Sequence, residues 1–218
     1  MPTEFRDRAD AGRQLARALS TYAGRRDVRV LGLPRGGVAV AFEVASALAA
    51  PLDVFLVRKL GVPVQPELAM GAIAPGGVQV IDHELVRHLR VSQQEMDETI
   101  AAESEELRRR EEAYRGDRPP LELGGMTVIL VDDGIATGST MRAAVESTRL
   151  LGPAAVVAAV PVAPATALRD LGAVADEVVC LATPRPFRAI GLWYRDFTQM
   201  TDDQVRHLLA STPAQAPD

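Results

Sequence analysis

Short apolar runs recur along this chain of 218 residues, and segments compatible with helices alternate with them. Runs this short and continuous are typical of strands buried on both faces of a sheet. The alternation therefore predicts an α/β fold with a doubly wound, mainly parallel sheet. The length fits a single domain, residues 1–218, built on one core. The predicted strands are Val28–Leu33, Leu52–Val57, Thr127–Val131, Ala154–Val160 and Glu177–Leu181.

The charge and the cysteine content exclude several classes of protein. Lysine and arginine total 24 against 29 aspartate and glutamate residues, a net charge of −5. An acidic chain is poorly suited to a polyanion, so we exclude nucleic acid as the main partner. Cys180 is the one cysteine and cannot form a disulfide within the chain. The N-terminus, Met1–Arg13, is charged, and no run of about 18 apolar residues occurs. We therefore predict a cytoplasmic protein that is neither exported nor membrane-spanning.

The middle of the chain departs from the alternation of strands and helices. Residues 58–66 combine basic side chains with glycine and two prolines and lack apolar periodicity, which predicts a long mobile loop. Met70–Ala74 and Val78–Ile81 flank a Pro-Gly-Gly turn signal, which predicts a hairpin.

Two further segments lie outside the predicted core. Residues 82–122 predict a helical insertion, because Ser92 and Glu95 form a capping box that begins a charged helix ending near Tyr114. The charge run within it, Arg108–Glu112, is typical of a solvated helix face, and we assign it no chemistry. Residues 183–210 are predicted to form a small C-terminal hood and a closing helix.

A pair of acids and a small-residue turn follow the predicted strand Thr127–Val131. Ligands of open parallel sheets bind beyond the carboxyl ends of the strands, which is where Asp132 and Asp133 lie. Residues 136–140, Ala-Thr-Gly-Ser-Thr, then offer hydroxyls and backbone N–H groups at a helix N-terminus, which favours a phosphate. The two acids can accept hydrogen bonds from ribose hydroxyls or hold a hydrated Mg²⁺. Together these groups suit a sugar phosphate.

The segment Val128–Thr140, VILVDDGIATGST, resembles the signature of type I phosphoribosyltransferases for 5-phosphoribosyl-1-pyrophosphate (PRPP). The resemblance implies that Asp132 and Asp133 hold the ribose hydroxyls, and Mg²⁺ through water or those hydroxyls. Residues 136–140 would hold the 5′-phosphate. Leu33–Val38 resembles the pyrophosphate loop of the family. The implied PRPP-binding residues are Arg35, Gly36, Gly37, Asp132, Asp133, Ala136, Thr137, Gly138, Ser139 and Thr140.

In that family, an acceptor nitrogen displaces pyrophosphate from the anomeric carbon of PRPP in a reaction that depends on Mg²⁺. By resemblance, Arg58 and Lys59 begin a catalytic lid over residues 59–68 and, with Asp132 and Asp133, are the expected catalytic residues. The lid would bring positive charge to the leaving pyrophosphate and exclude water. The resemblance also implies a homodimer.

The acceptor is not specified by these motifs. Enzymes that act on hypoxanthine and guanine carry an acid where this chain has Ala136, which argues against a 6-oxopurine. We expect the acceptor, a planar molecule such as a nucleobase, to be selected by Thr183–Phe197, with Phe187, Ile190 and Trp193 as candidate contacts. The same rings could instead pack a small C-terminal core.

Two other functions remain open from the sequence. A PRPP-sensing regulator would keep the phosphate cradle without transferring the ribosyl group, although its cue, a basic nucleic-acid face, conflicts with the acidic composition. A structural relative would use the charged helix 92–114 as an interaction arm.

Overall fold

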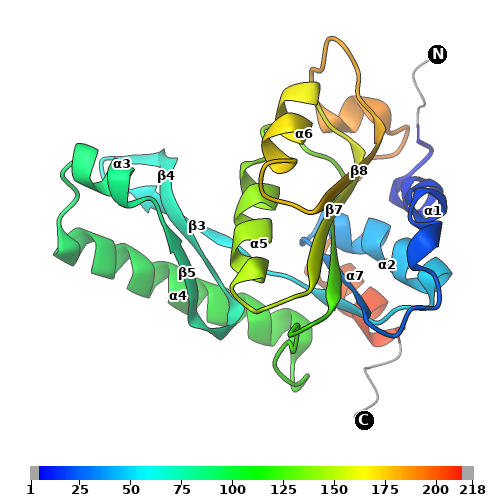
Figure 1. Ribbon diagram of the computed structural model, residues 1–218, viewed down its shortest axis with the longest axis horizontal. Helices are drawn as coiled ribbons and strands as arrows, with labels where there is room; N and C mark the ends of the chain where they lie inside the picture. Colours follow the sequence, from blue (N-terminus) through cyan, green and yellow to red (C-terminus); the bar gives the residue numbers. More distant parts are fainter. Residues whose placement is uncertain (1–4, 213–218) are drawn as a thin grey trace.

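The computed structural model describes residues 5–212, and its centre is a five-stranded parallel sheet in the order β2-β1-β6-β7-β8 (Figure 1). This sheet confirms the predicted doubly wound α/β fold. Strand β6 is buried along its whole length, and each fully buried aliphatic side chain stabilises the fold by roughly 1.5–3 kcal/mol. The strands are β1 (Val28–Gly32), β2 (Leu52–Val54), β6 (Thr127–Val131), β7 (Ala155–Val162) and β8 (Glu177–Ala182).

Helices cover both faces of this sheet. Helices α1 (Arg8–Ala18), α2 (Gly36–Leu48) and α7 (Asp202–Ala210) share one apolar cluster, and α5 (Ser139–Arg149) and α6 (Ala165–Leu171) belong to another on the opposite face. A capping box formed by Thr201 and Gln204 begins α7. Short 3₁₀ turns lie at Ser20–Tyr22, Pro75–Gly77 and Ile190–Trp193.

A second, antiparallel sheet extends to the left of the core in Figure 1. Its strands are β3 (Arg58–Val62), β4 (Gln65–Ala74) and β5 (Val78–Ile81), and α3 (His83–His88) and α4 (Gln93–Arg115) accompany it. We call residues 58–115 the lobe. The hairpin predicted from the Pro-Gly-Gly turn is confirmed, as is the capping box at Ser92 and Glu95. The division of the chain at 82–122 stays a prediction, since the helices of that range accompany a sheet that begins at Arg58.

The prediction of an irregular loop at 58–66 was wrong, because these residues form β3 and the start of β4. The two breaker residues fit the strands for local reasons. Gly61 lies where the pairing register shifts, and a Cβ there would approach the Pro66 carbonyl oxygen to 2.7 Å. Pro66 precedes the part of β4 that pairs with β5, so it faces a partner strand on one side only. The bulge at Gly61 and the one-sided pairing at Pro66 thus explain why residue types that usually end strands are tolerated here.

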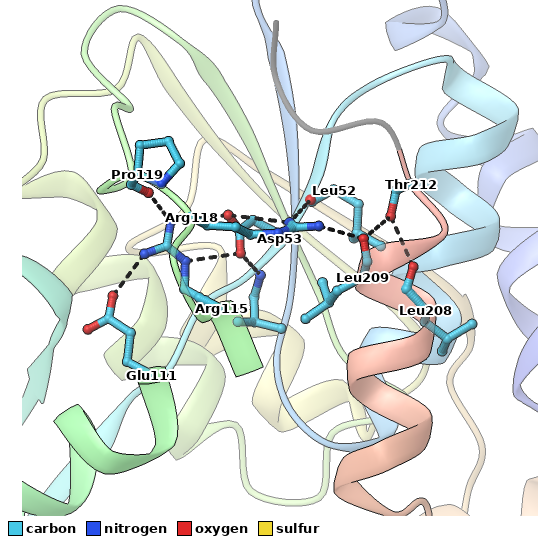
Figure 2. Close-up of polar contacts among 10 residues, drawn as sticks. Leu52, Asp53, Glu111, Arg115, Arg118, Pro119, Leu208, Leu209 and Thr212 are labelled. Carbon is cyan, nitrogen blue, oxygen red and sulfur yellow. Dashed lines mark hydrogen bonds and ion pairs between the residues drawn. The ribbon is translucent and has the colours of Figure 1, made fainter. Parts of the chain in front are cut away.

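Figure 2 shows how the C-terminal end of α4 is tied to edge strand β2. The guanidinium of Arg115, only 5% exposed, donates to both carboxylate oxygens of Asp53 at 3.1 and 3.2 Å. Arg115 also pairs with Glu111 at 3.0 Å, and Arg118 donates to the carbonyl oxygens of Leu52 and Leu209. These bonds fix α4 against both β2 and α7.

Candidate active site

The strand order creates a crevice at the carboxyl ends of β1 and β6. The chain passes from β1 to β2 on one side of β1, whereas β6 pairs with β1 on the other side. Ligands of open α/β sheets bind at such a switch point. Asp132 and Asp133 follow β6, and Leu33 to Arg35 follow β1, so the structure brings the two predicted segments to one crevice.

The two segments are in direct contact. The amide of Leu33 donates to the carbonyl of Val131 at 2.9 Å, and the peptide bond between Pro34 and Arg35 is cis. A Cβ at Gly36 would lie 1.9 Å from Oδ2 of Asp133, and one at Gly37 would lie 2.8 Å from Cα of Asp132. Only glycine leaves room for the acids, which explains the Gly-Gly pair at the first turn of α2.

Residues 134–138 form the turn that leads into α5. The amide of Ile135 donates to the carbonyl of Val162 at 2.9 Å, which fixes the start of the turn to β7. Gly138 is the N-cap of α5, and its φ of +85° favours glycine. The side chains of residues 136, 137, 139 and 140 are exposed or partly exposed, and the first N–H groups of a helix have no partner within it. Residues 134–140, which we call the phosphate turn, can therefore receive a phosphate from solvent.

Arg58 and Lys59 point to different partners. The ammonium of Lys59 donates to Oγ of Ser139 at 2.6 Å, so this side chain lies at the phosphate turn. The guanidinium of Arg58 donates from Nε to Glu103 of α4 at 2.6 Å. Adjacent residues of a strand point to opposite faces, which explains the division. Lys59 is thus held at the turn, while Arg58 is held by the lobe.

Burial governs the charge of the two acids. Burial, and then the negative charge of Asp133, raise the pKa of Asp132 well above its ordinary value. Burial also raises the pKa of Asp133, and the guanidinium of Arg8 acts in the opposite direction. Two adjacent carboxylates in a crevice favour a cation or several hydrogen-bond donors.

Arg8 is a site residue that the sequence reasoning missed. Its Nε donates to Oδ2 of Asp133 at 2.7 Å, both side chains are nearly buried, and its guanidinium lies 4.0 Å from the ring centre of Phe197. Tyr194 is a second one: its hydroxyl donates to the carbonyl of Asp133 at 2.6 Å, and burial raises its pKa, so it stays protonated. The sequence shows only a charged segment here, and no local pattern distinguishes Arg8 from Arg6.

The predicted hood residues pack against Phe5 and Ala11. Phe187, Ile190 and Trp193 are partly buried against a small core that contains Phe5 and Tyr194. Ile190 also covers the phosphate turn, since a Cβ at Gly134 would lie 2.5 Å from its Cγ2. The rings therefore have a packing role, and their contact with an acceptor stays a prediction.

The acids suit magnesium better than a metal held by protein alone. Within residues 5–212, no group of three or more histidine, cysteine, aspartate or glutamate side chains could hold a metal ion. Mg²⁺ in phosphate-binding enzymes uses one or two carboxylates and completes its coordination with water and substrate oxygens. Asp132 and Asp133 could supply such carboxylates, and their binding of Mg²⁺ through water or ribose hydroxyls stays a prediction.

The turn at 134–138, the two acids and the arginine-bearing loop lie together at one switch point of the sheet, in an arrangement that could accommodate a phosphorylated ligand. A family model described as the phosphoribosyl transferase domain matches residues 3–185. The chain belongs to this family, as the resemblance of Val128–Thr140 predicted.

Three known proteins are particularly similar. Two Mycobacterium tuberculosis proteins, from two strains and provisionally named phosphoribosyl transferases, are each 52% identical over 201 residues, which cover 92% of this chain and 45% of theirs. This chain thus spans less than half of their length. The crystal structure of TT1426 from Thermus thermophilus is 46% identical, with a TM-score of 0.86 over 94% of this chain and 97% of that one. Separately, among the described residues, no helix is long and apolar enough to cross a membrane.

Proposed function

We propose that this protein transfers the 5-phosphoribosyl group of PRPP to a nitrogen of a planar acceptor, with release of pyrophosphate and dependence on Mg²⁺. The observation that carries the proposal is the contact of Gly36 and Gly37 with Asp132 and Asp133. This contact joins the arginine-bearing loop and the acid pair beside the phosphate turn. The arrangement suits the three parts of PRPP, which are the diphosphate, the ribose and the 5′-phosphate.

Each part of PRPP has a matching set of groups. The backbone N–H groups and hydroxyls of Ala136, Thr137, Gly138, Ser139 and Thr140 would bind the 5′-phosphate. Asp132 and Asp133 would accept hydrogen bonds from the ribose hydroxyls, with Arg8 and Tyr194 holding Asp133 in place. Arg35 would bind the diphosphate with its two-pronged guanidinium, and Gly36 and Gly37 leave room for it.

The reaction needs positioning more than proton transfer. A lone pair of the acceptor nitrogen forms the new bond to the anomeric carbon as the bond from that carbon to the pyrophosphate oxygen breaks, and pyrophosphate leaves with the electron pair. Where the acceptor nitrogen carries a proton, that proton passes to solvent. When bound, Mg²⁺ would offset the charge that develops on pyrophosphate. Arg35 and Arg58 add positive charge on the same side, and Lys59 holds the phosphate turn through Ser139.

The acceptor and the assembly belong to the proposal as well. Thr183–Phe197 is the segment that we expect to select the acceptor, with Phe187, Ile190 and Trp193 as contacts, because Ile190 already overhangs the turn at Gly134. A homodimer, a cytoplasmic location and the closing of residues 59–68, which belong to β3, β4 and the turn between them, as a lid over bound substrate stay predictions.

A panel of nucleobases tests this function. Each base is incubated with the protein, PRPP and Mg²⁺, and released pyrophosphate is measured. We expect release with at least one base and none when Mg²⁺ is chelated. PRPP binding without release for any base would favour a PRPP-sensing regulator instead.

A further inference from the structure

A cleft of about 480 Å³ separates α4 of the lobe from the loop after β1, and four arginines are among the residues that line it. Arg35 and Arg58 line one side, and Arg109 and Arg110 of α4 line the other. Asp202 is the one acid among the described lining residues. Four guanidinium groups in one cleft stand out in a chain whose net charge is −5. Such a concentration of positive charge favours an anionic ligand.

Neighbouring acids balance this charge only in part. Arg109 and Arg110 both donate to Glu106, at 2.8 and 2.6 Å, so one carboxylate serves two guanidinium groups. Arg35 has a long contact of 3.9 Å with Asp202, whose Oδ1 already accepts a 2.6 Å hydrogen bond from Tyr114. Arg58, by contrast, is paired closely with Glu103. Arg35 and the Arg109–Arg110 pair therefore retain capacity for an anion.

The cleft adjoins the proposed PRPP site. Its lining includes Pro34 and Arg35 of the loop after β1, and Thr140 of the phosphate turn. A ligand that places its 5′-phosphate at the turn and its ribose at Asp132 and Asp133 would direct its diphosphate toward Arg35 and hence toward this cleft. Planar guanidinium groups bind phosphate oxygens in pairs, which suits a diphosphate.

Side-chain bonds fix the position of α4, so its arginines are preorganised for binding a ligand. Arg115 is held by Asp53 and Glu111, as Figure 2 shows. Tyr114, which also lines the cleft, is buried and bonded to Asp202 of α7. Arg110 lies four residues before Tyr114, one helical turn away on the same face. Fixing the helix lowers the entropy lost when these side chains bind a ligand.

We propose that Arg110 of α4, assisted by Arg109, binds the diphosphate group of PRPP and of the released pyrophosphate. This inference rests on the proposed function and extends the binding site into the lobe, where the sequence had indicated only a solvated charge run. Arg108 does belong to such a solvated face: it pairs with Glu105 and Glu112 and does not line the cleft. It therefore provides a matched control on the same helix.

Calorimetric titration with inorganic pyrophosphate, and separately with PRPP, both with Mg²⁺, tests the proposal on the full chain. We expect Arg110→Gln to weaken binding of both ligands about five- to tenfold, since an exposed charge-assisted contact is lost. Arg109→Gln should have a smaller effect, and Arg108→Gln should bind both ligands like the wild type. Circular dichroism verifies that each variant is folded.

The outcomes separate this proposal from the proposed function. Wild-type affinity in Arg110→Gln, together with weaker binding in Arg35→Gln, would overturn the role of α4 and leave the PRPP site intact. An equal loss in Arg108→Gln and Arg110→Gln would also overturn it, because bulk charge would then account for the effect. Failure of the wild-type protein to bind either ligand would overturn both.

Discussion

The crevice of the core sheet and the lobe use different chemistry for what we propose is one substrate. In the crevice, glycines, small side chains and strand ends bring groups so close that Gly36 has no room for a Cβ beside Asp133. In the lobe, long arginines on a largely exposed helix provide charge. The crevice can therefore recognise the shape of a ligand at short range. The arginines of the lobe instead attract an anionic ligand electrostatically, and this attraction persists when the ligand is displaced slightly.

Breaking the ion pair between Arg115 of the lobe and Asp53 of the core sheet should have the largest effect, a loss of folding stability. Arg115→Ala removes the guanidinium that pairs with Asp53 and leaves a nearly buried carboxylate with less positive charge beside it. Breaking a buried ion pair in this way costs roughly 3–5 kcal/mol. Urea unfolding followed by circular dichroism measures this loss. Arg108→Ala is the control, since its ion pairs are exposed and should contribute little. Equal stability of the two variants would show that the lobe is not anchored through Arg115.

A substitution confined to the crevice should have the second-largest effect, a loss of PRPP affinity. Gly36→Ala places a methyl group where Oδ2 of Asp133 lies, so the acid must move while the strands stay in place. Displacing a binding group by about 1 Å can lower activity about a hundredfold, and we expect a loss of PRPP affinity of that order. The matched control is Gly124→Ala, where a Cβ would meet no atom within 4 Å. Similar PRPP affinity in both variants would contradict the tight contact that distinguishes the crevice.

The smallest expected effect is on the pH dependence of stability, and it concerns Tyr114 at the border of the cleft. Burial, and then the hydrogen bond to Asp202, raise the pKa of Tyr114 from 10.0 to about 12. Because the folded state keeps this proton longer than the unfolded state, the stabilisation is complete below pH 10 and is lost as pH rises toward 12. Tyr114→Phe should therefore lose less stability than the wild type over that interval. Parallel alkaline unfolding curves of the two proteins would contradict the raised pKa of Tyr114.

The core and the phosphate turn were predictable because local signals carry them. Continuous apolar runs such as Thr127–Val131 specify buried strands, and Asp132 to Thr140 lie next to each other in sequence, so their chemistry could be interpreted without a fold. The position of both segments at strand ends was predictable in the same way, whereas the close approach of Gly36 to Asp133 was evident only in the structure.

The remaining site residues could not be predicted because tertiary packing decides their roles. Arg8 reaches Asp133 across 125 positions of sequence, and nothing near it in the chain signals that contact. Residues 58–66 lack a strand signal because the bulge at Gly61 exists only through pairing with β4. Within the charge run Arg108–Glu112, Arg110 lines the cleft whereas Arg108 pairs with Glu112 on the solvated face. This difference arises only from the docking of α4, so the sequence could not show it.

Titration of PRPP into the wild-type protein and Asp133→Asn, each with Mg²⁺ and with a chelator, tests the central claim most directly. The account predicts clear binding by the wild type with Mg²⁺ and much weaker binding with chelator, where the acids and the diphosphate would repel. Asp133→Asn should lose roughly 1.5–3 kcal/mol of binding free energy, the usual contribution of a charge-assisted hydrogen bond. Equal affinity under all four conditions would mean that the acids only end a strand and that PRPP is not the ligand of this crevice.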